Sequence, residues 1–192
     1  AHVKGFSVAI SRETATLMGM STADLPICAT SSQARAALEE RLGHVFVRPE
    51  LLDLALTHSS WANECDGGQS HNERQEFLGD AVLELCVSWE LFRRFPDARE
   101  GEMTKLRARL VSTVSLAERA REFGLDGLLK LGKGEERQGG RSRDSVLSDA
   151  LEAVLAAVYE DGGFAAAQEA VARIFEPHWP QVAGQPQRKD YK

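Results

Sequence analysis

Two mostly apolar helical segments each carry acids on the side that faces away from their apolar stripe. Because an ideal helix advances about 100° per residue, Glu73, Glu76 and Asp80 fall within an arc of roughly 60°. The second segment repeats the design with Asp149 and Glu152. A fold that contains both segments must either expose both groups of acids to water or bring them together, so this feature constrains the chain most.

The stripe opposite the acids is the expected core face of each helix. These stripes consist of Leu78, Val82, Leu85 and Trp89 on the first helix and of Leu147, Leu151, Val154 and Val158 on the second. The small residues Ala81, Ala153 and Ala156 flank the acids. The two helices could therefore approach closely at the acids and bring the carboxylates of both together.

A converged cluster of carboxylates repels itself unless protons or cations neutralise it. Hard oxygen ligands with no companion Cys or His suit Mg²⁺ or Mn²⁺. The simpler interpretation is that each group of acids belongs to a solvated helix face, which is common at these spacings. The repetition of one design on two apolar helices favours the metal site.

The bulk composition describes one ordinary domain. The chain has 192 residues, of which 43% are hydrophobic, and no apolar run approaches the ~20 residues that cross a membrane. Cys28, Cys65 and Cys86 form an odd set without CxxC spacing, which predicts free thiols in a reducing compartment, the cytoplasm. The net charge of −6 argues against a nucleic-acid partner only weakly, because bound cations would cancel part of it.

Helical periodicity dominates and strand alternation is almost absent, so the sequence predicts an all-α fold. Helices are expected over 33–43, 49–57, 73–95, 102–111, 113–123, 146–161 and 164–175, with one helical turn over 126–131. The segments 63–72 and 132–145 are expected to be loops. We divide the chain into an N-terminal extension of unknown role (1–30), a catalytic domain (31–180) and a linker (181–192).

The segment that starts at Asn72 reads NERQEFLGDAVL and resembles NERLEFLGDAVL, the signature of the ribonuclease III family. Four further segments resemble family motifs in the same order. They are 56–59 (LTHS, against LTHRS), 99–108 (against EGDLTKLRA), 131–141 (against LGKGE…GGR) and 149–153 (DALEA). Together they cover residues 34 to 192, and a double-stranded-RNA-binding domain usually follows in the family. We expect that domain to be missing here because the chain is truncated at the linker.

The resemblance implies the homodimeric helical fold of that family's endonuclease domain. It also implies Mg²⁺-dependent hydrolysis of double-stranded RNA to 5′-phosphate and 3′-hydroxyl ends, in RNA processing and maturation. Glu76, Asp80, Asp149 and Glu152 fall where the family holds its Mg²⁺, and Mn²⁺ is expected to substitute. Glu73 and Glu100 fall on two further family acids that support substrate or metal positioning, so the set of acids is intact.

The resemblance also implies a position for Phe77, which enters a pocket on the partner subunit in the family. From the residues alone, Phe77 is a large apolar side chain on the acidic side of its helix, which is costly unless something covers it. The alternative is that it packs under its own chain. Gln75 departs from the family signature, where Leu is usual, and its amide could alter local packing or substrate contact.

Basic residues cluster in two segments, where we expect contacts with the RNA backbone. These residues are Lys105, Arg107 and Arg109 in one segment and Arg141 and Arg143 in the other. His58 is expected to be a structural residue at a helix end. Two alternatives to this nuclease stay open: a non-cleaving dimeric module that binds duplex RNA or protein, and a nuclease of the same fold that needs no accessory RNA-binding domain.

Overall fold

The computed structural model describes residues 27–65 and 70–179, and every regular element in them is helical. In order these elements are α2 (Ile27–Leu42), α3 (Pro49–Ala55), α4 (Ser59–Glu64), α5 (Glu73–Arg94), α6 (Glu100–Leu110), α7 (Thr113–Glu122), α8 (Lys133–Arg137), the 3₁₀ turn η2 (Gly140–Ser142) and α9 (Asp144–Phe175). The predicted all-α fold is confirmed. None of these helices is both long and apolar enough to cross a bilayer.

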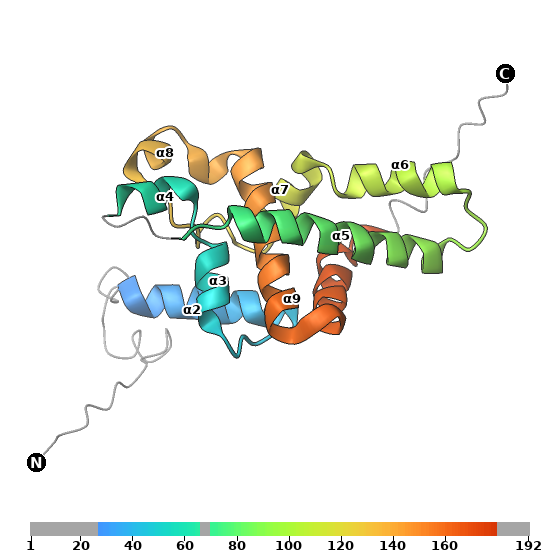
Figure 1. Cartoon of the computed structure of the whole chain (residues 1–192), viewed down its shortest axis with the longest axis horizontal. Helices are drawn as coiled ribbons and strands as arrows, with labels where there is room; N and C mark the ends of the chain where they lie inside the picture. The colour runs from blue at the N-terminus through green and yellow to red at the C-terminus, as the bar shows by residue number, and fades with distance from the viewer. Residues whose placement is uncertain (1–26, 66–69, 180–192) are drawn as a thin grey trace, which may run out of the picture.

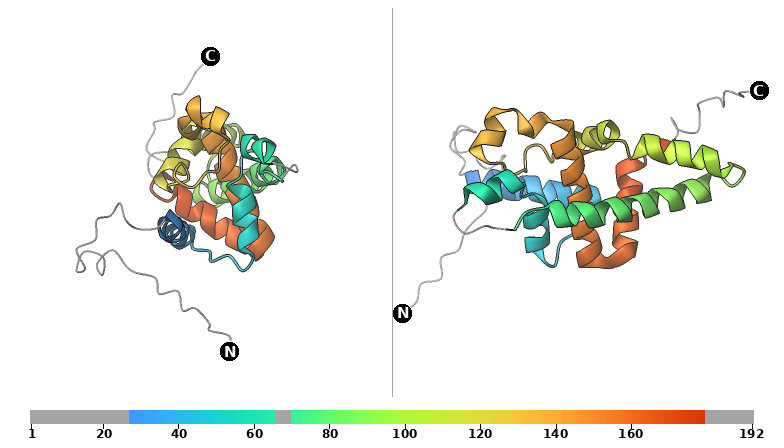
Figure 2. Two further views of the ribbon diagram at one scale, coloured as in Figure 1. Left: turned by 90° about the vertical axis from the view of Figure 1, so that its left-hand side faces the viewer. Right: turned by 45° about the horizontal axis from the view of Figure 1, so that its top comes forward.

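Helix α5 runs along the long axis of the molecule, and α6 returns antiparallel beside it (Figure 1). The first half of α9 crosses α5 near the middle of the molecule, and the short helices α4 and α8 lie together at one end (Figures 1 and 2). Most tertiary contacts of α5 and α7 are made with α9. Helix α9 is therefore the central element that the others surround.

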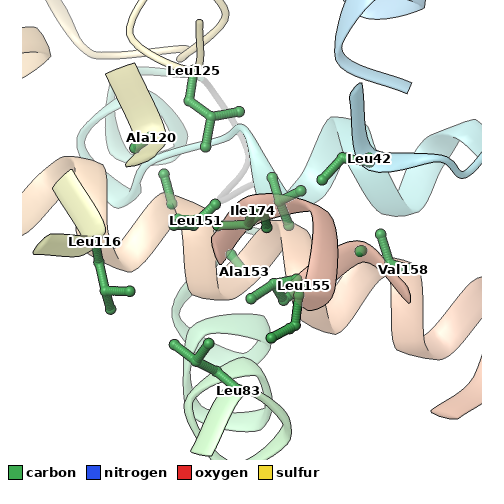
Figure 3. Close-up of a cluster of buried hydrophobic side chains, with 14 of the residues drawn as sticks. Leu42, Leu83, Leu116, Ala120, Leu125, Leu151, Ala153, Leu155, Val158 and Ile174 are labelled. Carbon is green, nitrogen blue, oxygen red and sulfur yellow. The ribbon is translucent and has the colours of Figure 1, made fainter. Parts of the chain in front are cut away.

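The first half of α9 is the centre of the hydrophobic core. The predicted stripe of Leu147, Leu151, Val154 and Val158 is fully buried, as are Ala153, Leu155 and Ala157 on the other sides of the helix. Figure 3 shows this cluster packing against Leu83 of α5, Leu116 of α7 and Leu42 of α2. Burial on several sides explains why this helix is rich in small and aliphatic residues.

The prediction of which face of α5 is buried is wrong for the second half of this helix. Leu85 is 56% exposed and Trp89 is 50% exposed, whereas Val82 is buried and Leu78 packs against the edge of the core. The face that α5 buries against α9 contains Gly79, Val82, Leu83, Cys86, Val87, Glu90 and Leu91. Helix α5 has apolar residues on two faces, and helical periodicity does not tell which of the two the rest of the chain covers.

The two helices expected over 146–161 and 164–175 form one element that bends at Gly163. Gly163 has φ 76° and ψ −174°, a backbone conformation that only glycine adopts readily. The bend turns the second half of α9 back beside the first half (Figures 1 and 2). This return lets Ile174 and Phe175 join the core.

The short elements differ most from the predictions. Helix α4 and the pair α8 and η2 lie in or beside segments expected to be loops, and 126–131 contains no helix. Instead, Lys130 forms an isolated parallel bridge with Thr57. Helix α2 begins at Ile27, inside the expected extension, while 1–26 and 181–192 lie outside the described residues.

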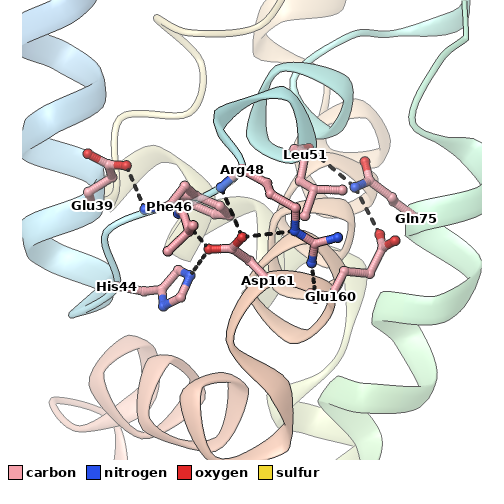
Figure 4. Close-up of polar contacts among 9 residues, drawn as sticks. Glu39, His44, Phe46, Arg48, Leu51, Gln75, Glu160 and Asp161 are labelled. Carbon is pink, nitrogen blue, oxygen red and sulfur yellow. Dashed lines mark hydrogen bonds and ion pairs between the residues drawn. The ribbon is translucent and has the colours of Figure 1, made fainter.

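A buried carboxylate fastens the turn after α2 to the end of the first half of α9. Asp161 has no exposed side-chain surface and accepts hydrogen bonds from His44 Nε2 at 2.9 Å, Val47 N at 2.9 Å and Arg48 N at 3.0 Å (Figure 4). Gln75 extends this network, because its Nε2 donates to Leu51 O and to Glu160 Oε1, each at 3.2 Å. These bonds tie α2, α3, α5 and α9 together beside the bend.

We expect Gly163→Ala to lower the free energy of unfolding by about 1–3 kcal/mol, because alanine is strained at this φ and ψ. No atom lies within 4 Å of the added Cβ, so the loss would come from the backbone alone. Gly101→Ala is the matched control. Its Cβ also meets nothing within 4 Å, but Gly101 has helical geometry, so stability should stay equal or rise by up to ~1 kcal/mol. Urea denaturation measures both, and equal effects would contradict the assignment of strain to Gly163.

Candidate metal centre

Helices α5 and α9 cross at Gly79, and this crossing positions the site. A Cβ at Gly79 would lie 1.9 Å from Glu152 O and 2.4 Å from Glu152 C, which no side chain could tolerate without moving one helix. The backbones of α5 and α9 are therefore so close at this point that only the hydrogen atom of a glycine fits between them. Ala153 and Ala156 of α9 are buried as expected, but Ala81 is exposed, so Gly79 permits the close approach on the α5 side. An isolated glycine inside an apolar helix was the sequence signal for it.

Three of the predicted acids meet beside this crossing. Glu76 from the first turn of α5 and Asp149 and Glu152 from α9 each offer a carboxylate oxygen, and these oxygens all lie within 4.8 Å of one another. All three side chains are partly buried. Residues separated by more than 70 positions in the sequence thus share one small volume of space.

Burial and mutual repulsion both disfavour the charged forms of these carboxyls. The pKa of Glu152 rises to about 8, first because of its burial and then because of the negative charges of Asp80, Asp149 and Glu76. The pKa of Glu76 is raised too, by burial and by Asp149, Glu73 and Asp80. The cluster therefore holds protons that isolated carboxyls would release, unless a cation takes their place.

The pKa of Asp149 is also raised by burial, but two neighbours oppose the rise. Ser148 Oγ lies 3.3 Å from Asp149 Oδ1, and an electrostatic interaction with His58 lowers the pKa of the same carboxyl. His58 caps α4 as expected of a structural residue, because its Nδ1 accepts from Ser60 N at 3.2 Å. The sequence carried no signal that this cap lies within electrostatic reach of the acids.

The other predicted acids have different surroundings. Asp80 and Glu73 are exposed on α5 at the edge of the cluster, and their charges act on its buried members. Glu100 lies on α6, where it accepts a hydrogen bond from Thr104 Oγ1 at 2.9 Å and lines a pocket with Leu85 and Trp89. None of these three acids is part of the converged group of Glu76, Asp149 and Glu152, and Glu100, unlike Asp80 and Glu73, is not among the charges that act on it.

The arrangement fits a small divalent cation. Opposite oxygens around Mg²⁺ lie about 4 Å apart, given Mg–O distances of about 2.1 Å. The three oxygens here all lie within 4.8 Å of one another, which is close enough for small movements to bring them onto one such ion. All donors are carboxylate oxygens, which hard cations prefer to soft ones. A cation would also relieve the repulsion that raises the pKa values of Glu76 and Glu152.

Phe77 and its neighbours form an exposed apolar face on α5. Phe77 is 83% exposed, and Leu85, Trp89 and Phe92 also expose half or more of their surface. A pocket of about 510 Å³ lies between α5 and α6, and Met103 of α6 completes its apolar lining. The alternative that Phe77 packs under its own chain is thus contradicted for the described residues.

The basic residues predicted to contact RNA have unequal surroundings. Lys105 is exposed on α6 and has no hydrogen bond or ion pair with the described residues, and Arg109 is exposed on the same helix. Arg107 Nη1 donates to Ser88 Oγ at 2.9 Å. Arg141 and Arg143 are ion-paired with Glu136 and Glu135, respectively.

The described residues thus define a helical protein with a cluster of three carboxylates that could hold a metal ion. The sequence model of the family described as Ribonuclease-III-like matches residues 48–178, which is more than half of the chain. The chain therefore belongs to this family, as its motifs predicted.

Curated relatives and solved structures agree with this assignment. Over 155 residues the chain is 61% identical to Ribonuclease 3 of Nitratidesulfovibrio vulgaris and 59% identical to Ribonuclease 3 of Oleidesulfovibrio alaskensis. These matches cover 81% of this chain but 61% and 68% of the two relatives. The chain thus spans about three fifths of the length of the first relative.

Among solved structures, two of the nuclease domain of ribonuclease III from Campylobacter jejuni are 40% identical to this chain. Their TM-scores are 0.69 and 0.70, and the matches cover 75% and 76% of this chain and 97% and 96% of theirs. One of these two structures is described as showing structural flexibility in a region involved in dimer formation. Dicer from Pichia stipitis is 25% identical, with a TM-score of 0.55, over 72% of this chain and 59% of that one.

The raised pKa of Glu152 predicts how the stability of the metal-free protein depends on pH. Between pH 4.5 and pH 8 the folded protein holds a proton on Glu152 that the unfolded chain has released, so stability should fall as pH rises through this window. Glu152→Gln removes this loss. In EDTA, we expect its Tm to match that of the unsubstituted protein near pH 5 and to exceed it by at least ~4 °C at pH 8.5.

The control for this measurement is Glu84→Gln, the same substitution at an exposed position of α5. Its Tm difference from the unsubstituted protein should not change with pH. A Glu152→Gln difference that is equally constant would show that the carboxyl is not crowded in the folded state.

Proposed function

We propose that this chain is the nuclease part of a Mg²⁺-dependent endoribonuclease that hydrolyses phosphodiester bonds of double-stranded RNA in RNA processing and maturation. The convergence of Glu76, Asp149 and Glu152 across the α5–α9 crossing carries this proposal. Family membership supports it, because the acids lie at the motif positions where the family holds its metal. Mn²⁺ should replace Mg²⁺, since it prefers the same oxygen donors.

In this proposal Glu76, Asp149 and Glu152 would hold the cation, and Asp80 would add negative charge at the exposed edge of the cluster. A divalent cation, when bound, would supply positive charge that makes water a nucleophile near neutral pH and stabilises the leaving 3′-oxygen. The Glu152 carboxyl would have to be ionised in order to act as a ligand. Glu73 and Glu100 support substrate or metal positioning.

We further propose that the protein acts as a homodimer through the apolar face of α5. Phe77 is far too exposed for a large aromatic side chain of a monomer, and the pocket between α5 and α6 offers apolar walls on the same helix. Each subunit would contribute one site, so that a dimer cuts both strands of a duplex with a short 3′ stagger. The products would carry 5′-phosphate and 3′-hydroxyl ends.

Contacts with the RNA are proposed for basic side chains that remain accessible. An A-form duplex is recognised mainly through its phosphates, its 2′-hydroxyls and its shape. On α6, Lys105 and Arg109 are exposed, and Arg107 lies between them in sequence. We keep these three residues as candidates for contacts with the duplex backbone.

Incubation of the protein with a long RNA duplex and Mg²⁺ should produce fragments with 5′-phosphate ends, and EDTA should abolish the cleavage. Glu152→Gln should reduce the cleavage rate at least ~100-fold, because it removes one charged ligand, while duplex binding is retained. Glu84→Gln should cleave normally. Binding without any Mg²⁺-dependent cleavage would instead favour a non-cleaving duplex-binding module.

Phe77→Ala should weaken the dimer by roughly 2–4 kcal/mol, because it removes a large aromatic side chain from the proposed interface. Sedimentation equilibrium over a concentration series measures the dimer dissociation constant, which should rise by about 30- to 1000-fold. Val47→Ala is the control, since Val47 is 85% exposed but lies in the turn before α3. An unchanged dimer in the Phe77 variant would exclude this face as the interface.

A further inference from the structure

The Gly- and Arg-rich segment that precedes α9 divides its positive charges into two groups. Lys133 and Arg137 lie on α8, whereas Arg141 and Arg143 follow it around η2. From the sequence, Arg141 and Arg143 were the residues of this segment expected to contact RNA. In the structure, one group is bound within the protein and the other faces outwards.

Arg141 and Arg143 are engaged by the acids of α8 itself. Arg141 donates from Nε and Nη2 to the two carboxylate oxygens of Glu136 at 2.8 and 2.7 Å, and from Nη1 to Asp126 O at 2.5 Å. Arg143 Nη1 lies 2.8 Å from Glu135 Oε1. The bidentate pair holds the pKa of Glu136 below its usual value. A guanidinium held by three acceptors has little capacity left for a phosphate.

Lys133 and Arg137 occupy the outward side of the same helix turn. They are four residues apart, so their Cβ atoms are neighbours at about 5–6 Å. Both side chains are exposed, and neither forms a hydrogen bond or ion pair with its side chain within the described part of the chain. Glu64 lies near both charges, but its carboxylate accepts hydrogen bonds from Lys133 N at 2.8 Å and Gly134 N at 3.1 Å.

The neighbours of α8 connect it to the metal centre. Gly132 N donates to Ser60 Oγ at 2.9 Å, and Ser60 Oγ lies 2.8 Å from His58 Nδ1. His58 interacts electrostatically with Asp149 of the acid cluster. Figures 1 and 2 show α8 beside α4 at the same end of the molecule. Gly132, Ser60 and His58 thus connect α8 with the edge of the metal centre.

Close packing in the loop after α8 supports the same division. A Cβ at Gly140 would lie 2.4 Å from Glu135 Oε1, so only glycine lets the Glu135 carboxylate occupy its place beside Arg143. The Glu135 side chain is therefore largely covered at this end of the segment, whereas Glu136 is exposed and paired with Arg141. Lys133 and Arg137 are the basic side chains of α8 that these two pairs leave unpaired.

We infer that Lys133 and Arg137 form a contact for the phosphate backbone of duplex RNA and that Arg141 and Arg143 position α8 instead of contacting RNA. This inference rests on the proposed function, because it assumes that duplex RNA is the substrate. Two adjacent cations near a cluster of carboxylates provide the positive charge that a polyanion needs in order to approach that cluster. Phosphate contacts orient the duplex without reading its sequence.

The test is the salt dependence of duplex binding. Every protein carries Glu152→Gln, so that RNA is not cut, and binding to a fluorescent 30-base-pair RNA is followed by anisotropy in Mg²⁺ from 50 to 300 mM KCl. Lys133→Gln with Arg137→Gln should reduce the slope of log K against log salt by about 1–2, because up to two phosphate contacts are lost. Its Tm should equal that of the Glu152→Gln parent.

The matched variants are Arg141→Gln and Arg141→Lys. Both should lower Tm, since lysine keeps the charge but cannot replace the bidentate guanidinium, and both should keep the parent slope. Arg143→Gln serves the same purpose if the Arg141 variants fail to fold. An unchanged slope in the Lys133 and Arg137 variant, or an equal loss of slope in Arg141→Gln, would overturn the inference while the proposed function stands. A parent that binds no duplex would overturn the proposed function itself.

Discussion

The backbone contact between Gly79 and Glu152 is the constraint on which the rest of the structure depends. Two helices that carry acids on their facing edges repel each other, so they stay together only if apolar packing on either side exceeds that repulsion. Helix α9 provides this packing, because its first half is buried on several sides against α2, α5 and α7. The crossing then holds Glu76, Asp149 and Glu152 at a separation that they would not adopt in water.

The packing of α5 against α9 keeps carboxyl groups that repel one another close together. The pKa of Glu152 is raised to about 8 because the buried carboxyl cannot move away from its neighbours. If the site holds a divalent cation as proposed, it would bind that cation more strongly than a flexible set of acids would, since little conformational freedom remains to be lost. The network around Asp161 stiffens the same helix at the bend after Glu160 and thereby limits relaxation from that side.

The sequence predicted the buried face correctly for a helix that is covered on several sides. It failed for a helix with two apolar faces, of which the fold covers only one. The stripe on α9 was correct because that helix is central, and its apolar residues are buried whichever way it is turned. On α5, Leu85 and Trp89 were assigned to the core, but the chain buries the face with Cys86 and Leu91 instead. The short helices α4 and α8 were missed because side-chain bonds from elsewhere, such as that from Glu64 to α8, hold them in place.

The sequence by itself determined the all-helical fold, the family and the identity of the acids, because periodicity and motif spacing are local properties that survive without coordinates. Only the tertiary structure decided that Glu100 lies outside the cluster and that Phe77 is exposed. It also decided that the Arg141 guanidinium forms an ion pair with Glu136. These outcomes depend on distances between residues far apart in the chain. Such distances follow from how whole helices pack, since burial of α9 and not the preference of any single side chain sets the position of every helix around it.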